Sequence, residues 1–548
     1  MNSEIEHLPS DTAELQSLVR ELLIKQKNIS FDNETLEKLK HTHENELKEE
    51  RIKYRLLEEK YQVLQKRFFG RKSEKLSHDN PDQLRLFNEA EESVGTEEKG
   101  DTEEEDSSVV IKSYTRRKSG RRPLDENLPR EEVVHDCTDE EKKCPCCGEE
   151  RPRIGEDVTE ELDIISAQIK VIKHVRPKYG PCSCDDFLHE KVPEIATGAM
   201  PPRLIPHSIA SAGLIAYIVT SKFADALPFY RQSKIFSRIN VDISRATLSN
   251  WTIRAAEQCE NLIPLLKDAI RGGPLIQMDE TVVQVLHEEG RAPQNKSYMW
   301  AAVGYPASGK KLVLFEYHPG RSGEIPQEIL TGYLGYLQTD GYAGYNKSGG
   351  LSGITHVGCF AHARRKFTEA LTADKKSKNA RKALMFIQKL YKIENGLRSQ
   401  NISSEEFVAK REKESQPVLD EFHAWLSVKC DEILPGSKIG RAIRYTLNEW
   451  DKLVRYLEAE ILTPDNNRVE NAIRPFVVGR KNWLFSNTPR GARSSALMYS
   501  LVESAKANGL DPYRYLRYLF THLPAASTDE ERIRLLPHVV DAERLLNG

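Results

Sequence analysis

Pro274-Leu-Ile-Gln-Met-Asp279-Glu-Thr-Val-Val-Gln-Val-Leu286 is the stretch that decides the fold of this 548-residue chain. Its aliphatic and β-branched residues predict a strand, with Asp279 within or beside it. The setting recurs in Leu337-Gln-Thr-Asp340-Gly-Tyr. A third acidic residue, Glu470, stands in a segment that predicts a helix, whose apolar face carries Val469, Ile473 and Val477. We expect two strand carboxylates and one helix carboxylate to converge on one point.

The order of elements around Asp279 predicts a ribonuclease H-like α/β domain. A helix-like stretch, Glu324–Tyr333, separates the third of five β-rich runs from the fourth, and another helix begins at Ala361. In that fold the first and fourth strands lie side by side, which would bring Asp279 next to Asp340. The five runs are Leu275–Leu286, Ser297–Gly304, Lys311–His318, Tyr336–Thr339 and Thr355–Cys359.

A helical insertion is predicted between Asp340 and Glu470, which are 470 − 340 = 130 residues apart. The sequence from Asp374 to about Lys438 is polar and helix-prone, and a helical run from Gly440 to Glu460 returns the chain to the site.

Heptads of apolar residues mark the first seventy residues. They recur every seven positions in two sets that are joined by a four-residue stutter, which predicts a long helix with a seam and a homodimeric coiled coil. An antiparallel hairpin folded near 28–33 is the alternative. The first set is Leu15, Leu22, Ile29 and Leu36, and the second is Leu47, Tyr54, Tyr61 and Phe68.

Charge divides the chain despite a net charge of −3. Glu89–Asp106 holds ten acidic residues and one lysine, net −9, so the remaining chain carries −3 − (−9) = +6. The acidic stretch predicts a disordered linker. A basic segment from Arg116 follows, which either contacts phosphates or is a solvated linker end.

Paired cysteines predict a zinc-binding module. Cys144 and Cys147 form a CxxC turn closed by glycine, and Cys182 and Cys184 form the second pair as CxC. Cys137 and Cys146 are spare donors, so the fourth ligand stays open, and reduced thiols without metal are the alternative. The alternating Leu162–Val175 between the pairs predicts a ribbon over the metal.

Residues 200–270 predict helices, and Leu227–Trp251 has the order helix, turn, helix. Ser244 is a candidate N-cap, and Ala246, Leu248 and Trp251 are expected to hold the second helix against the first. The other face of the second helix would then expose residues of the types that contact DNA. Many helical hairpins that do not bind DNA have the same spacing of helices and turn. These residues are Arg245, Thr247, Ser249, Asn250 and Arg254.

Three converging carboxylates suit hard cations, because Mg²⁺ prefers oxygen ligands. Two Mg²⁺ ions held by Asp279, Asp340 and Glu470 would serve phosphodiester chemistry. Arginines and aromatic residues crowd the sequence after Glu470, and Arg474, Arg480 and Lys481 are candidate DNA contacts. Cys359 and His362 have metal-ligand spacing, but a structural role between strand and helix is the expectation there.

The nine cysteines are expected to be thiols or metal ligands, because neither a secretory signal nor an apolar run long enough to span a bilayer is visible. A soluble cytoplasmic protein is the default expectation.

The sequence resembles the IS66 family of insertion-sequence transposases over nearly its whole length. The matching blocks include Phe68-Phe-Gly-Arg-Lys-Ser-Glu-Lys-Leu, Gln277-Met-Asp-Glu-Thr, Thr339-Asp-Gly-Tyr, Cys359-Phe-Ala-His362-Ala-Arg-Arg-Lys-Phe and Asn467-Arg-Val-Glu-Asn-Ala-Ile-Arg-Pro. The resemblance implies a bacterial, nucleoid-associated transposase with Asp279, Asp340 and Glu470 as a DDE triad. It also implies Mg²⁺-dependent cutting and joining of double-stranded DNA at element ends, and small accessory proteins from the same element. The CxC pair departs from the CxxC expected of the family.

The predicted architecture is multidomain, α and α/β. Two other readings compete with the active enzyme: a catalytically silent zinc-containing DNA-binding protein, and a nuclease that cuts without joining. The predicted parts are a coiled coil at 1–75, an acidic and basic disordered linker at 76–125, a zinc-binding module at 126–195, a helix-turn-helix-like DNA-binding region at 196–270, the catalytic domain at 271–372 and 441–500, its helical insertion at 373–440 and a C-terminal helical element at 501–548.

Overall fold

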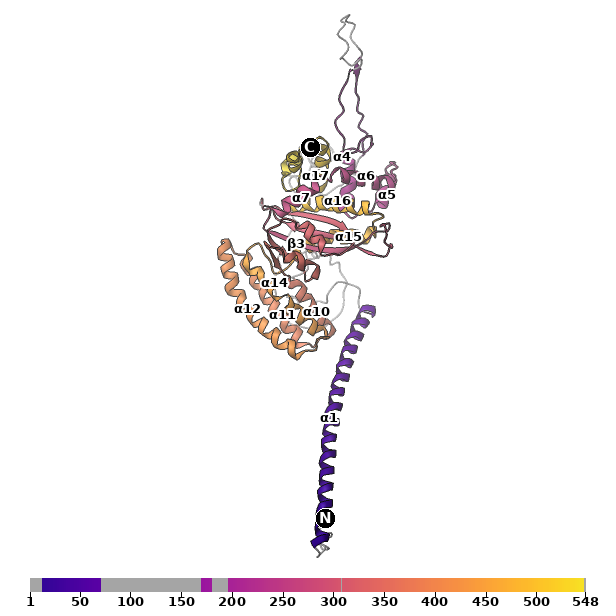
Figure 1. The fold of residues 1–548 in the computed structure, drawn as a ribbon. Coiled ribbons are helices and arrows are strands. Elements are labelled where there is room, and N and C mark those ends of the chain that lie inside the picture. The colour runs from indigo at the N-terminus through magenta and orange to yellow at the C-terminus, as the bar shows by residue number, and fades with distance from the viewer. Residues whose placement is uncertain (1–11, 70–168, 180–195, 307, 547–548) are drawn as a thin grey trace, which may run out of the picture. The chain divides into compact units, whose positions relative to one another are not determined.

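The structure is a computed structural model that describes residues 12–69, 169–179, 196–306 and 308–546 (Figure 1). The chain divides into two compact units, one of Met1–Arg71 with Met200–Gly548 and the other of Lys72–Ala199. The four predicted zinc ligands and the acidic linker lie outside the described residues.

The N-terminal helix α1 (Thr12–Phe69) runs without a break, so the hairpin alternative near 28–33 is wrong. Seam residues remain exposed on the single chain, with Leu22, Ile29 and Leu36 at 57%, 60% and 63%. The coiled-coil pairing itself stays a prediction.

In the second unit, β1 (Lys178–Tyr179) pairs antiparallel with β2 (Ala196–Thr197). The ribbon predicted for Leu162–Val175 is wrong over its described part, because Ile169–Val175 forms no strand there. The apolar side chains of this part are exposed, with Val171 at 94%. An alternating pattern forms a strand only where a partner strand pairs with it and another surface covers its apolar face, and the described residues provide neither for Ile169–Val175.

A five-stranded sheet forms the centre of the larger unit, in the order β5-β4-β3-β6-β7. β3, β4 and β5 are an antiparallel meander, whereas β6 and β7 run parallel to β3. The predicted adjacency of the first and fourth strands is therefore confirmed. The strands are β3 (Leu275–Gln284), β4 (Lys296–Gly304), β5 (Leu312–His318), β6 (Gly335–Gln338) and β7 (Ile354–Val357).

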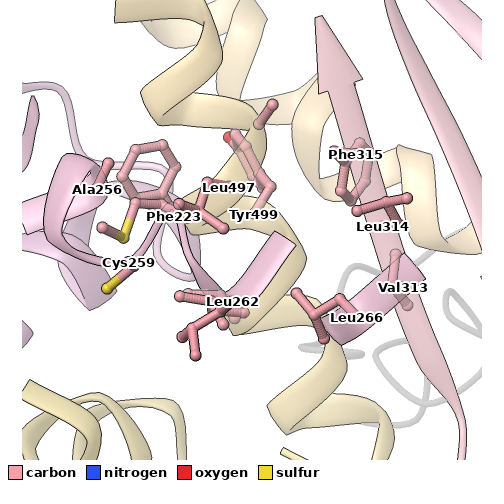
Figure 2. Packing of buried hydrophobic residues seen from close by; sticks show 14 of the residues in the cluster. Phe223, Ala256, Cys259, Leu262, Leu266, Val313, Leu314, Phe315, Leu497 and Tyr499 are labelled. Atoms are coloured by element: carbon pink, nitrogen blue, oxygen red, sulfur yellow. The ribbon is translucent and has the colours of Figure 1, made fainter. Parts of the chain in front are cut away.

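Helices before and after the sheet build one core with it. The preceding helices are α4 (Ala212–Phe223), α5 (Phe229–Arg238), α6 (Arg245–Gln258) and α7 (Leu262–Arg271). The following helices are α15 (Asn467–Trp483), α16 (Pro489–Ala507), α17 (Pro512–His522), η4 (Leu523–Ala525), α18 (Asp529–Ile533) and α19 (Ala542–Leu546). Figure 2 shows α4, α6 and α7 side chains meeting Leu497 and Tyr499 of α16 beside Phe315 of β5.

Helix α16 also satisfies the edge of β5. Ser504 Oγ accepts from the N–H of Val313 at 2.9 Å, and Ser500 Oγ accepts from that of Phe315 at 2.7 Å. Asn508 continues the row by donating to the carbonyl of Lys311 at 2.7 Å. These three residues are four apart and share one helix face, so they take the place of a sixth strand on an edge that would otherwise be open.

Between the sheet and α15 lies a helical segment that contains the predicted insertion. Its elements are α10 (Phe360–Ala373), α11 (Lys378–Arg398), α12 (Ser404–Glu432), α13 (Lys438–Asn448), α14 (Trp450–Leu453) and η3 (Val454–Glu458). Three short elements connect the strands of the sheet instead: α8 (Glu324–Ile329) before β6, and η2 (Ala343–Tyr345) and α9 (Asn346–Gly349) between β6 and β7. Inside it, the fully buried Arg411 binds Glu394 at 2.8 Å and the carbonyls of Tyr456 and Ala459 at 2.6 and 2.8 Å.

Candidate functional site

Two of the candidate carboxylates come from adjacent parallel strands. β3 and β6 pair in a register that sets Gln277 opposite Gln338. Asp279 is two residues beyond Gln277, and Asp340 is two residues beyond Gln338, so each carboxylate follows its glutamine on the same face of the chain. Asp340 lies two residues past the end of β6, beside the strand, in agreement with the predicted run Tyr336–Thr339.

The turn after Asp340 is held tightly. Asp340 Oδ1 accepts from the N–H of Tyr342 at 3.0 Å. At Gly341, an added Cβ would lie 2.6 Å from ring atoms of Tyr445 on α13, so only glycine fits between Asp340 and this ring.

The glutamine pair ties the two strands together below the carboxylates. Gln277 Nε2 donates to Gln338 Oε1 at 2.6 Å, and both side chains are fully buried. Gln338 Nε2 donates in turn to the carbonyl of Thr463 at 2.7 Å, and Gln277 Nε2 donates to that of Asp465 at 3.4 Å. The pair therefore also binds the chain that leads into α15.

We call Leu462–Asn466 the anchor segment, because its backbone is bound from several sides. Its Leu462 carbonyl accepts from Arg411 at 3.1 Å, and its Pro464 carbonyl accepts from the N–H of Phe360 at 2.8 Å. Asn466 Nδ2 donates to the carbonyl of Met278 at 3.1 Å, and the Asn466 N–H lies 3.3 Å from Cys359 Sγ. The anchor segment fixes where α15 begins, and Glu470 is in its first turn.

Burial and the charges of neighbouring acids both act on Asp279. Burial raises the pKa of Asp279 well above its usual value, and the charges of Glu280, Asp340 and Glu470 raise it further, while the N–H of Glu280 opposes this by donating to Asp279. Such mutual repulsion is what a bound cation relieves. The convergence of the three carboxylates on one point stays a prediction.

Glu280, the next residue on β3, has its own partners. Arg321 donates to Glu280 Oε1 at 2.6 Å, and the Tyr345 hydroxyl donates to Oε2 at 2.5 Å. The Arg321 guanidinium also stacks over the Tyr342 ring at 3.6 Å. These contacts satisfy Glu280, whereas Asp279 has no ion pair with any of the residues that the structure describes.

Cys359 and His362 lie beside Glu470. Cys359 is the N-cap of α10, and His362 is in its first turn, whereas the structural role expected for them stays a prediction. His362 Nδ1 is 3.8 Å from Glu470 Oε1, and Arg365 contacts Glu470 Oε2 at 3.5 Å. Burial lowers the pKa of His362 and raises that of the Cys359 thiol, so both are neutral without a further ligand.

The helical hairpin predicted upstream forms as α5 and α6. Ser244 caps α6 by accepting from the N–H of Thr247 at 3.1 Å, and Leu248 and Trp251 are buried as expected. Ala246 is exposed, so its predicted packing role is wrong; the helix turns that position to solvent. Among the DNA-contact candidates, Arg245 and Asn250 are exposed, and those partly buried are Thr247, Ser249 and Arg254.

The basic candidates on α15 differ from one another. Arg474 and Lys481 are exposed. Arg480 instead donates to Thr281 Oγ1 at 3.2 Å and to the carbonyl of Val282, which ties α15 to β3. Arg480 therefore holds α15 against β3 through these hydrogen bonds.

Sequence reasoning missed the residues that hold the carboxylates, chiefly Gln277, Gln338 and Asn466. The one signal available was that a glutamine stands two residues before each strand aspartate. Within the described residues, none of the helices has the length and apolar character that crossing a bilayer requires.

Comparisons with known proteins agree along the chain. Family models match under the descriptions "Transposase IS66 family" at residues 207–494, "Transposase C of IS166 homeodomain" at 56–133, "zinc-finger binding domain of transposase IS66" at 141–185 and "IS66 C-terminal element" at 500–538. Among relatives from Sinorhizobium fredii, "Uncharacterized protein y4jD" is 30% identical over 75% of this chain and 80% of its own length. "Uncharacterized protein y4hP" is 28% identical over 84% of both chains.

Proposed function

Because the chain belongs to the IS66 transposase family, we propose that Asp279, Asp340 and Glu470 are its DDE triad and that it cuts and joins DNA at the ends of an insertion sequence. The observation that carries this proposal is the parallel pairing of β3 with β6, in whose register Gln277 lies opposite Gln338, two residues before Asp279 and Asp340 respectively. The strand order, with Asp279 and Asp340 on neighbouring strands, supports a ribonuclease H-like assignment for the sheet.

The donor set fits divalent cations. All three groups are carboxylates, and Glu470 Oε1 is buried without a hydrogen-bond partner among the described residues. Asp279, Asp340 and Glu470 would together hold two Mg²⁺ ions. Bound there, such ions would activate a water or a 3′-hydroxyl and stabilise the leaving oxygen.

The chain's own residues would keep this site in one geometry. The buried Gln277–Gln338 pair fixes the spacing of the two strand ends, and the anchor segment fixes the start of α15. Rigid placement matters, because a displacement of about 1 Å can lower a rate by about a hundredfold.

DNA would bind through basic and polar side chains outside the triad. Arg245 and Asn250 are exposed on α6, and Arg474 and Lys481 are exposed on α15. Arg245, Thr247, Ser249, Asn250 and Arg254 remain the proposed contacts from the helical hairpin. Each phosphate contact should add to the salt dependence of binding.

Further partners follow from the other parts of the chain. We propose that Cys144, Cys147, Cys182 and Cys184 bind Zn²⁺, in line with the zinc-finger match over 141–185. A second copy of α1 would cover the exposed seam of the first and give a homodimer. Small accessory proteins of the same element are proposed as additional partners.

Strand cleavage and strand transfer on DNA that carries the element's own ends test the catalytic proposal. Asp279→Asn, Asp340→Asn and Glu470→Gln should each abolish products in Mg²⁺ or Mn²⁺ while DNA binding persists. Glu328→Gln, at an exposed carboxylate of α8, is the matched control and should keep activity. Cleavage without transfer would indicate a nuclease. Binding without any products, even with accessory proteins present, would favour the catalytically silent DNA-binding protein.

A further inference from the structure

A cluster of mixed metal-ligand groups lies at the edge of the proposed triad. Cys359 Sγ, a ring nitrogen of His362 and a carboxylate oxygen of Glu470 all lie within 4.8 Å of one another. The first two come from the start of α10 and the third from the first turn of α15. Glu470 and His362 are partly exposed, with side chains at 26% and 17%, so an ion can reach the cluster from solvent.

Two atoms in this cluster face each other without a hydrogen bond. His362 Nδ1 and Glu470 Oε1 are buried and have no hydrogen-bond partner among the described residues. Their separation of 3.8 Å is too long for a direct hydrogen bond. A buried polar atom without a partner is costly, so a pair of them facing one another indicates a ligand between them. A metal ion with ligand bonds of about 2.0–2.2 Å to nitrogen and oxygen would fit that spacing.

Two backbone features beside Cys359 favour a thiolate, although burial and the neighbouring carboxylates oppose one until a cation is bound. Cys359 Sγ lies 3.3 Å from the backbone N–H of Asn466, a donor that strengthens when sulfur is charged. Cys359 is also the N-cap of α10, where the helix dipole favours negative charge. Support of this kind behind a ligand atom is typical of protein metal sites.

We propose that Cys359, His362 and Glu470 form a binding site for a thiophilic divalent cation such as Zn²⁺, with one coordination position left open. Sulfur and imidazole donors select zinc-like ions over Mg²⁺. On binding, the Cys359 thiol gives its proton to solvent and the thiolate joins the metal. The site rests on the proposed function in one respect: it shares Glu470 with the triad, so Zn²⁺ and Mg²⁺ compete for one carboxylate and Zn²⁺ inhibits catalysis.

Co²⁺ is the probe, because thiolate-bound tetrahedral Co²⁺ has a charge-transfer band and strong visible bands. Reduced full-length protein is titrated beside Cys359→Ser, His362→Asn and the matched control Cys430→Ser, which replaces a cysteine of α12 outside the cluster. The cysteines at 144–184 also take Co²⁺, so the readout is the difference between variants. Wild type and Cys430→Ser should bind one equivalent more than Cys359→Ser, and Zn²⁺ should displace it.

His362→Asn keeps the thiol and provides a second arm if Cys359→Ser loses thermal stability. Its extra equivalent should bind more weakly by roughly tenfold or more, since even outer-shell changes at metal sites cost about that much. Equal stoichiometry and identical spectra in all four proteins would overturn the proposed site.

Asp279→Asn separates this inference from the catalytic proposal. It should abolish strand cleavage yet keep the extra Co²⁺ equivalent, because Asp279 is outside the cluster. Retained cleavage in Asp279→Asn would refute the triad and leave the metal site standing. Loss of the Co²⁺ difference alone would refute the metal site and leave the triad standing.

Discussion

Replacing Asn466 with alanine tests whether the anchor segment positions Glu470. The strand pairing of β3 with β6 ends at Gln277, and the carbonyl of the next residue, Met278, accepts from Asn466 Nδ2 at 3.1 Å. Asn466 is fully buried. The variant would leave that carbonyl without this donor, a loss of about 1–3 kcal/mol in the free energy of unfolding.

The catalytic effect should exceed the loss of stability. If α15 shifts at its first turn, Glu470 moves relative to Asp279, and a displacement of about 1 Å can cost about a hundredfold in rate. We therefore expect weaker apparent Mg²⁺ affinity and about hundredfold slower cleavage in protein that is still folded at the assay temperature.

Asn482→Ala is the matched control for Asn466→Ala. Asn482 is on the same helix and makes one hydrogen bond of its amide to a backbone carbonyl, that of Ala226 at 3.2 Å, but it is exposed. Its loss should stay within about 0.5 kcal/mol and leave cleavage unchanged. Urea denaturation measures the free energy of unfolding, Mg²⁺ titration the apparent metal affinity, and single-turnover assays the cleavage rate. Equal behaviour of the two alanine variants in these assays would refute the role of the anchor segment.

Three further predictions follow from buried polar groups. Because the pKa of Asp279 is raised in the folded state, its protonation stabilises the metal-free fold; this contribution is complete below the unfolded-state pKa and is lost once the pH has risen through the folded-state pKa. The Tm of the metal-free protein should therefore fall across that pH range in wild type but not in Asp279→Asn. A wild-type Tm that is independent of pH would contradict this. Ser504→Ala leaves the Val313 N–H without its acceptor and should cost about 1–3 kcal/mol in urea denaturation, whereas Ser495→Ala, which loses only a bond within α16, should cost less; equal losses would argue against the edge role of Ser504. Arg411→Met takes from buried Glu394 one of its two arginine partners, Arg398 at 2.9 Å being the other, and it also removes a donor from the carbonyls of Tyr456 and Ala459, so it should cost about 1–3 kcal/mol in urea denaturation. Adding Glu394→Leu should recover part of that loss, and an additive double variant would refute the pairing.

The sequence could predict the strands and the helix of Glu470, because their patterns are local. Runs of aliphatic, aromatic and β-branched residues indicated β3 to β7, and apolar residues four apart indicated α15, with Val469 and Ile473 buried. The adjacency of Asp279 and Asp340 followed from element order alone. Features that depend on residue type and on the order of elements could therefore be predicted from the sequence.

The supporting contacts were out of reach because they join segments that are distant along the chain. Gln277 meets Gln338 across 61 positions and Asp465 across 188, and neither glutamine differs locally from any other strand glutamine. The row of Ser500, Ser504 and Asn508 is likewise visible only once α16 lies along β5. Ala246 shows the opposite failure, since a small apolar residue on a helix fits an exposed face as well as a buried one.

Glu470 is positioned by both the sheet and the inserted helices. Arg398 and Arg411, from α11 and α12, both donate to the carbonyl of Leu462, at 2.8 and 3.1 Å. Gln338 binds the next carbonyl from β6, and Asn466 reaches back to β3. Because successive residues of the anchor segment are bound by different parts of the fold, a change in either part would move the same helix start. The inserted helices thus act on the geometry of the proposed triad through the five residues 462–466.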